Sequence, residues 1–156
     1  MPLSYYGFLR ISELQNLKLE DIVFDSQEKR LILNIRFSKT DQYGKGTQAF
    51  IYENDKKYSP YKLYQILFDS IKDYDYIVQT TGNALRSHLK VILKHLGLNK
   101  HDYSWHSFRR GGAYQAALAG VNDSEIKKHG RWLSDAYIRY VAVDPERAGS
   151  SVSSKI

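Results

Sequence analysis

Residues 105–113 read Trp-His-Ser-Phe-Arg-Arg-Gly-Gly-Ala, and they constrain the fold and chemistry of this chain more than any other stretch. His106 and Arg109 lie three positions apart, so they share one face if the segment is helical. A helix start also offers free backbone N–H groups to an anion. Further along the chain, Arg131 is followed nine residues later by Tyr140. Cations and a phenol are groups that can hold a phosphodiester and attack it without a metal.

The composition fits one globular domain with a polyanionic partner. A chain of 156 residues, 42% of them hydrophobic, can bury an ordinary core. Its net charge of +6 favours nucleic acid as a partner, because neutralised phosphates release counterions. The absence of cysteine excludes a disulfide framework and a cysteine-based metal site. No apolar run approaches the roughly 20 residues of a membrane span, so we expect no membrane contact.

Hydrophobic periodicity and turn residues predict one helix, then a small sheet, then mostly helices. The predicted strands are 22–24, 30–37 and 47–52, with a glycine-containing loop over 40–46. The predicted helices are 10–18, 61–72, 83–96, 107–119, a short one capped by Asn122 and a last one capped by Ser134 or Asp135. We therefore expect an α+β fold, mostly helical, with a small three-stranded antiparallel sheet. Residues 1–148 would form one domain, and residues 149–156 a flexible tail.

A further arginine, Arg10, lies near the N-terminus in the segment Gly-Phe-Leu-Arg-Ile-Ser-Glu-Leu. Together with His106, Arg109 and Tyr140, this segment resembles the catalytic domain of tyrosine recombinases, the phage-integrase superfamily. The resemblance extends from residue 7 to about residue 143. It implies the tyrosine recombinase catalytic-domain fold, whose order of helix, sheet and helices is the order predicted above.

The resemblance also implies a role for each of these side chains. Arg10 and Arg109 would bind the scissile phosphate, for which a guanidinium is suited because its planar fork reaches two oxygens at once. His106 belongs to the same His-x-x-Arg element. Tyr140 would attack phosphorus and form a 3′-phosphotyrosyl DNA with a free 5′-hydroxyl. Tyr137, one helical turn earlier on the same face, is the competing nucleophile. Neither a metal nor another cofactor is required.

Family members also carry a lysine on the β-hairpin that protonates the leaving 5′ oxygen, a role that suits a flexible ammonium group. Lys39, at the end of the second predicted strand, is the favoured candidate. Lys45, in the sequence Gly-Lys-Gly, is the alternative. If it is not the general acid, it is expected to contact DNA.

The last catalytic position departs from the common pattern. The family has histidine or tryptophan nine residues before the nucleophile, where this chain has Arg131. The pattern Gly-Arg-Trp-x-Ser-x-Ala-Tyr-x-x-Tyr resembles eukaryotic mobile-element recombinases of the DIRS and crypton type. Arg131 could donate to a phosphate oxygen, whereas Trp132 could pack on the helix of the nucleophile. His129 is a further alternate, and the sequence leaves these possibilities open.

Neighbouring residues are expected to support the site. Arg110 lies off the face shared by His106 and Arg109, so we expect it to contact the DNA backbone or to act structurally. Gly111 and Gly112 cost about 1 kcal/mol each early in a helix, which makes sense if another backbone or DNA approaches closely. Three acidic residues are expected to stabilise the local structure or to pair with the site residues, and not to bind a metal. They are Glu13, Asp21 and Asp41.

The resemblance implies a site-specific DNA recombinase or integrase of a mobile element. Its expected partner is double-stranded DNA, bound by a homo-tetramer at two sites. Residues 147–156 are a candidate segment for exchange between protomers. Family members normally precede this domain with a core-binding domain, which we expect to be absent from this chain. A DNA partner also implies an intracellular protein, nuclear in a eukaryotic host.

Two other classes of function remain open. One is a catalytically inactive, domesticated relative that only binds DNA or protein. The other is a type IB topoisomerase-like enzyme, which shares the chemistry but relaxes DNA without exchanging partners.

Overall fold

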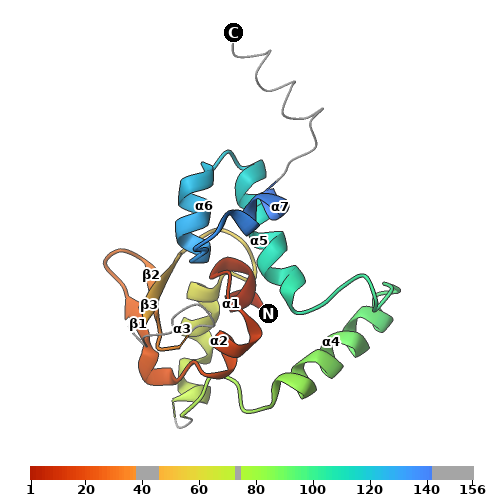
Figure 1. The fold of residues 1–156 in the computed structure, drawn as a ribbon. Coiled ribbons are helices and arrows are strands. Elements are labelled where there is room, and N and C mark those ends of the chain that lie inside the picture. Colours follow the sequence, from red (N-terminus) through yellow and green to blue (C-terminus); the bar gives the residue numbers. More distant parts are fainter. Residues whose placement is uncertain (38–45, 73–74, 142–156) are drawn as a thin grey trace.

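The computed structural model describes residues 1–37, 46–72 and 75–141, traced in Figure 1 from the N-terminus in red to the last helix in blue. The α-helices are α1 (Pro2–Tyr6), α2 (Ile11–Gln15), α3 (Pro60–Ile71), α4 (Gly82–His95), α5 (His106–Leu118), α6 (Asp123–Gly130) and α7 (Ile138–Val141). The strands and 3₁₀ helices are β1 (Ile22–Asp25), β2 (Arg30–Ile35), β3 (Thr47–Tyr52), η1 (Leu19–Asp21) and η2 (Asp135–Tyr137). Both hairpin lysines, Lys39 and Lys45, lie outside the described residues, as do Asp41 and the tail 149–156.

The predicted three-stranded sheet is confirmed. Its order is β1-β2-β3, and both pairs are antiparallel. Buried residues alternate along β2, so one face of this strand packs in the core. β3 has the bounds that its composition predicts. The strand predicted at 30–37 is too long: Arg36 binds Asp21 Oδ1 at 2.5 Å and Phe37 is exposed, so the alternation ends at Ile35.

Three of the predicted helices are confirmed within one residue at each end, and they are α3, α4 and α5. Asn122 caps α6 as predicted, because its side chain accepts the Glu125 N–H at 2.9 Å. The helix predicted at 10–18 is too long, since α2 ends at Gln15. Lys18 instead caps the next element, η1, and the Asp21 carboxylate accepts its backbone N–H at 3.0 Å.

Helix α1 was not predicted, because five residues are too few to show a helical period. Tertiary contacts hold it in place. The Trp105 indole N–H donates to the buried hydroxyl of Ser4 at 3.0 Å, which ties α1 to the start of α5. A side chain 101 residues away in the sequence therefore helps to hold α1 in place, and no local pattern predicts this contact.

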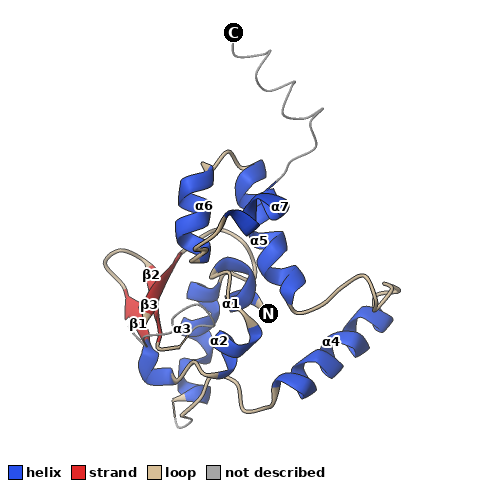
Figure 2. Ribbon diagram, viewed as in Figure 1, coloured by secondary structure: helices blue, strands red, loops and turns tan. Residues whose placement is uncertain are grey.

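Two hydrophobic cores flank the N-terminal segment. The larger one packs the inner face of the sheet against α2, α3 and α4. The smaller one joins α5, α6 and α7 through Phe8, Ala113, Ile126, Tyr137 and Val141. In Figure 2 the helices α5, α6 and α7 group on one side of α1, and the strands lie beside α3. The turn after α1 contributes Phe8 to the smaller core and Leu9 to the larger one.

The two glycines of α5 have different surroundings. A Cβ added to Gly112 would lie 2.2 Å from the Tyr5 carbonyl oxygen and 2.6 Å from Phe8 Cε1. A Cβ added to Gly111 would meet only the Tyr5 ring, at 3.5 Å. The expectation that another backbone approaches closely is therefore confirmed for Gly112, where α1 packs directly on α5.

This contact predicts that Gly112→Ala lowers the free energy of unfolding by about 1–3 kcal/mol, because the methyl group overlaps a backbone carbonyl. Gly111→Ala is the matched control. It meets an ordinary van der Waals contact and gains about 1 kcal/mol of helix propensity, so its stability should be unchanged or higher. Urea unfolding followed by circular dichroism measures both. Equal losses in the two variants would contradict this packing.

Candidate active site

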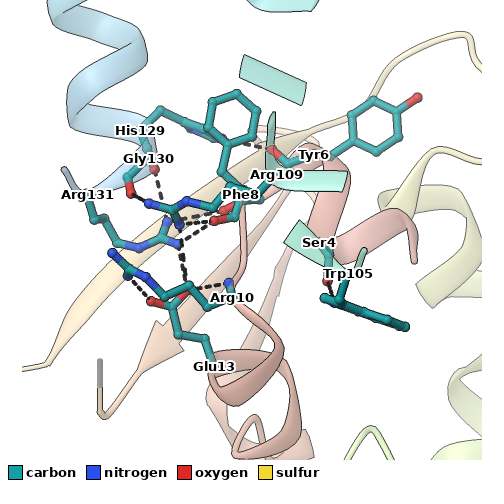
Figure 3. A network of polar contacts seen from close by, with 11 residues as sticks. Ser4, Tyr6, Phe8, Arg10, Glu13, Trp105, Arg109, His129, Gly130 and Arg131 are labelled. Atoms are coloured by element: carbon teal, nitrogen blue, oxygen red, sulfur yellow. Dashed lines mark hydrogen bonds and ion pairs between the residues drawn. The ribbon is translucent and has the colours of Figure 1, made fainter. Parts of the chain in front are cut away.

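A buried carboxylate organises the predicted site residues of the N-terminal segment. Glu13 has no exposed side-chain surface. Its carboxylate accepts the backbone N–H of Arg10 at 2.9 Å and the Arg10 Nη1 at 2.5 Å. It also accepts Arg131 Nη2 at 3.1 Å, while Arg109 Nη1 lies 4.0 Å away. Figure 3 shows this arginine cluster, Arg10, Arg109 and Arg131, converging on Glu13.

The local sequence explains how Glu13 comes to lie there. Arg10 has an extended backbone and caps α2, and Glu13 is the third residue of that helix. In this arrangement the side chain of the third residue reaches back to the capping N–H. Burial alone raises the pKa of Glu13, but the charge of Arg131 and the charge and hydrogen bonds of Arg10 outweigh it. The pKa of this carboxyl is therefore lowered, and Glu13 is a carboxylate at neutral pH.

Arg109 is the most deeply buried cation of the cluster, with 1% of its surface exposed. Its Nη1 donates to the Phe8 carbonyl and its Nη2 to the Gly130 carbonyl. Its guanidinium also lies 4.3 Å from the centre of the Trp132 ring, a cation–π distance. Burial lowers the pKa of Arg109, and the charges of Arg10 and Arg131 lower it further. Arg109 is thus a fixed positive charge whose two hydrogen-bond acceptors are neutral carbonyls.

Arg131 is also turned into the protein. Its Nη1 donates to the carbonyls of Gly7 at 3.2 Å and His129 at 2.9 Å. Its Nη2 donates to the Phe8 carbonyl at 3.1 Å as well as to Glu13. Only 8% of the side chain is exposed. Burial lowers its pKa, and Glu13 opposes this effect.

The structure brings Tyr140 to His106. The Tyr140 hydroxyl lies 3.0 Å from His106 Nε2, and the imidazole meets the phenol ring edge-on at 5.4 Å between centroids. The Trp132 ring lies 5.9 Å from the Tyr140 ring. This contact agrees with the possibility that Trp132 packs on the helix of the nucleophile. Tyr137, the competing candidate, is buried in the smaller core under Trp132.

The surroundings of His106 favour its neutral form. Burial lowers the pKa of His106, and the charges of Arg109, Arg110 and Arg10 lower it further. A neutral imidazole can accept a proton from the hydroxyl that it contacts. The pair His106–Tyr140 therefore has the geometry and the charge state of a base beside a phenol.

Arg110 and His129 have different surroundings. The Arg110 guanidinium lies 5.6 Å from the centre of the Tyr140 ring, so it borders the candidate nucleophile. His129 Nε2 donates to the Tyr6 carbonyl at 2.8 Å, and its ring packs edge-on against Phe8. Burial lowers the pKa of His129, which matches a neutral, structural histidine.

Sequence reasoning missed the backbone acceptors of the site. The Phe8 carbonyl accepts from both Arg109 and Arg131, and Phe8 has a left-handed backbone with φ of 47°. A phenylalanine gives no sequence signal for such a turn. The other acceptor, the Gly130 carbonyl, belongs to a residue for which the sequence does give a signal, because a glycine precedes a tryptophan by two positions. A Cβ at Gly130 would lie 1.7 Å from the Trp132 ring. The tryptophan two residues later folds back over it.

The described part of the chain lacks two kinds of feature. It contains no group of three or more histidine or acidic side chains placed to hold a metal ion. It also contains no helix with both the length and the apolar character that crossing a membrane requires.

Among the solved structures that share this arrangement of elements are two recombinases and an integrase. The XerA recombinase has a TM-score of 0.71 at 20% identity, over 99% of this chain and 56% of that chain. The protein has the fold of the tyrosine recombinase catalytic domain. The XerH site-specific recombinase bound to difH, in a pre-cleavage complex, gives 0.70 at 15% identity, over 97% of this chain and 44% of that chain. The Tn1549 transposon integrase, in complex with a circular intermediate DNA, gives 0.65 at 18% identity, over 99% of this chain and 56% of that chain.

The protein spans about half the length of these recombinases, so the fold is shared over their corresponding part only. No family model matches the sequence, and no curated protein matches it. The predicted resemblance to tyrosine recombinases is confirmed at the level of the fold.

The cluster predicts that Glu13→Gln lowers the free energy of unfolding by about 3–5 kcal/mol, because it leaves buried guanidiniums without a counter-charge. Glu20→Gln is the control, since Glu20 pairs with Arg36 at 2.7 Å on the surface and should change stability little. Chemical denaturation at neutral pH measures both. A Glu13→Gln protein as stable as the Glu20→Gln protein would contradict the role given to this carboxylate.

Proposed function

We propose that the protein cleaves and rejoins double-stranded DNA at specific sites through a 3′-phosphotyrosyl intermediate, with Tyr140 as the nucleophile. The observation that carries this proposal is the 3.0 Å contact between the Tyr140 hydroxyl and His106 Nε2 within one chain. His106 is three residues before Arg109, so the same helix that holds the base also holds a buried cation. A phenol, a base and fixed guanidiniums are the parts that metal-free phosphoryl transfer requires.

The proposed reaction is an in-line transesterification. His106 takes the phenol proton, and the Tyr140 oxygen attacks phosphorus. The new bond joins this oxygen to phosphorus, and the bond from phosphorus to the 5′ oxygen breaks. Arg10, whose side chain is 20% exposed, and Arg109 stabilise the charge that builds on the non-bridging oxygens. The leaving oxygen takes a proton from Lys39, with Lys45 as the alternative donor, and the reverse reaction rejoins DNA.

The proposed partners follow from charge and from the related structures. A net charge of +6 suits a polyanion, and the XerH and Tn1549 structures contain DNA. We propose a homo-tetramer on two DNA sites, as the family resemblance implies, and a role in mobile-element integration. A substrate with two sites separates this function from a topoisomerase-like one: a recombinase joins strands from different sites, whereas a topoisomerase only relaxes the DNA.

Tyr140→Phe should abolish the covalent protein–DNA adduct, because it removes only the attacking oxygen. A nicked suicide substrate traps the adduct, and a denaturing gel detects it. Tyr137→Phe is the matched control and should retain the adduct, since Tyr137 is buried in the smaller core. DNA binding should be similar in both variants. Adduct formation by Tyr140→Phe, or an adduct that peptide mapping places on Tyr137, would refute the assignment.

The rate of cleavage should depend on pH through His106. The neutral imidazole is the active form, and its pKa lies below the ordinary value of about 6.5. The rate should therefore hold as the pH falls through 6.5 and decline only at lower pH, as the base becomes protonated. Arg110→Gln removes one of the charges that lower this pKa, so the decline should begin at higher pH in that variant. A rate that rises on acidification would show that the protonated imidazole is the active form.

A further inference from the structure

We infer that Arg131 is a positioning residue: it pairs with the carboxylate of Glu13 and thereby keeps that carboxylate from neutralising the positive charge of Arg109. This inference rests on the proposed function, in which Arg109 stabilises the phosphoryl oxygens. It assigns to Arg131 a task different from the direct phosphate contact that its place nine residues before Tyr140 suggests.

The backbone at Arg131 is unfavourable for an arginine. Helix α6 ends at Gly130, and Arg131 follows it with φ of 57° and ψ of 39°, the left-handed conformation that favours glycine. A residue with a Cβ is disfavoured there by roughly 1–2 kcal/mol. Gly130, one residue earlier, lies under the Trp132 ring, where a Cβ would come within 1.7 Å of the ring. The interactions of the arginine side chain must offset the backbone cost.

The Arg131 side chain is directed into the protein. Arg131 donates to three carbonyl oxygens and to Glu13 at distances of 2.9–3.2 Å. Its remaining donor, Nε, is buried and has no partner among the residues that the structure describes. A guanidinium has five N–H groups, and Arg131 directs four to protein acceptors. It has little left to offer to a phosphate.

The distances around Glu13 show what Arg131 prevents. Arg10 and Arg131 lie at 2.5 Å and 3.1 Å from the carboxylate, and Arg109 lies at 4.0 Å. Three positive charges and one negative charge leave the cluster with two positive charges. Arg10 and Arg131 already contact the Glu13 carboxylate. Arg109 therefore lies too far from it for a close ion pair that would neutralise its positive charge. A preorganised charge of this kind stabilises a developing anion most effectively.

Arg131 also shares an acceptor with Arg109. Both donate to the Phe8 carbonyl, which belongs to a residue with a left-handed backbone. Arg131 holds the preceding carbonyl, that of Gly7, as well. Arg131 therefore also holds the turn at Gly7 and Phe8, and the Phe8 carbonyl of this turn orients Arg109.

Loss of the Arg131 side chain should let Glu13 pair with Arg109. Arg131→Gly removes the guanidinium and suits the left-handed backbone of residue 131, so the turn after α6 should be preserved. A shift of about 1 Å would then bring the carboxylate to Arg109 within ordinary ion-pair distance. Arg109 would lose its effective charge while the protein stays folded.

The test is the single-turnover rate of adduct formation at saturating nicked DNA. Arg131→Gly should slow this rate by about 10-fold or more, up to the roughly 10²–10³-fold loss that follows removal of a catalytic donor, and change DNA affinity much less. Adding Glu13→Gln to Arg131→Gly should restore much of the rate, because the carboxylate that neutralises Arg109 is gone. Arg131→Lys, which keeps a positive charge beside Glu13, should cleave faster than Arg131→Gly. Lys29→Gly is the control, since Lys29 also has a left-handed backbone but lies on the surface, and it should cleave normally.

Direct phosphate binding by Arg131 predicts a different result. The double variant would then cleave no faster than Arg131→Gly, and Arg131→Lys would rescue poorly because it lacks the fork. Either outcome would overturn the inference.

A second measurement does not depend on activity and covers the case in which the double variant fails to fold well enough to assay. Urea unfolding of Arg131→Gln, Glu13→Gln and the corresponding double variant gives the coupling between the two residues. A clear coupling supports the contact, whereas additive losses overturn it. If the parental protein forms no adduct while the coupling is present, then the proposed function has failed and the contact has not.

Discussion

The buried carboxylate of Glu13 is the interaction on which the rest of the site depends. A carboxylate without exposed surface is tolerated only when cations and N–H groups compensate it, and here Arg10 and Arg131 do so. These two arginines come from opposite ends of the chain, so one side chain links the start of α2 to the end of α6. The ion pairs that compensate this buried charge also fix the positions of Arg10 and Arg131.

The turn at Gly7 and Phe8 places this carboxylate between two cores. Phe8 packs with α5, α6 and α7, while its neighbour Leu9 packs with the sheet. The Phe8 carbonyl accepts from two guanidiniums, which joins the cores through polar contacts as well as apolar ones. Helix α1 packs directly against Gly112 of α5, where an added Cβ would overlap the Tyr5 carbonyl oxygen. The site is therefore a product of the contact between the N-terminal and C-terminal parts of the fold.

Local patterns predict the elements of this fold well. The bounds of β3 follow from composition, and α3, α4 and α5 lie within one residue of their predicted limits, because Pro60, Gly97 and Gly120 mark their ends in the sequence. The pairing of His106 with Tyr140 agrees with the roles that the family resemblance implies. The hairpin residues that include Lys39 lie outside the described part of the chain.

What the sequence did not predict depends on distant contacts. Helix α1 is held by the hydrogen bond from Trp105, and the carbonyl of the left-handed residue Phe8 accepts from the guanidiniums of Arg109 and Arg131. The inward direction of Arg131 depends on Glu13, a residue 118 positions earlier in the chain. A count of residues back from Tyr140 places Arg131 at a catalytic position but gives no information on where its side chain points.

The central claim is that one chain holds a complete site, with Tyr140 beside its own His106 and the arginine cluster. Mixing two inactive variants, Tyr140→Phe and Arg109→Ala, on nicked DNA tests this claim most directly. If each tyrosine acts in the site of its own chain, then neither variant can supply both groups, and the mixture should form no more adduct than the separate proteins. Adduct appearing in the mixture on the Arg109→Ala chain would show that Tyr140 enters the site of a neighbouring chain, and it would contradict the account.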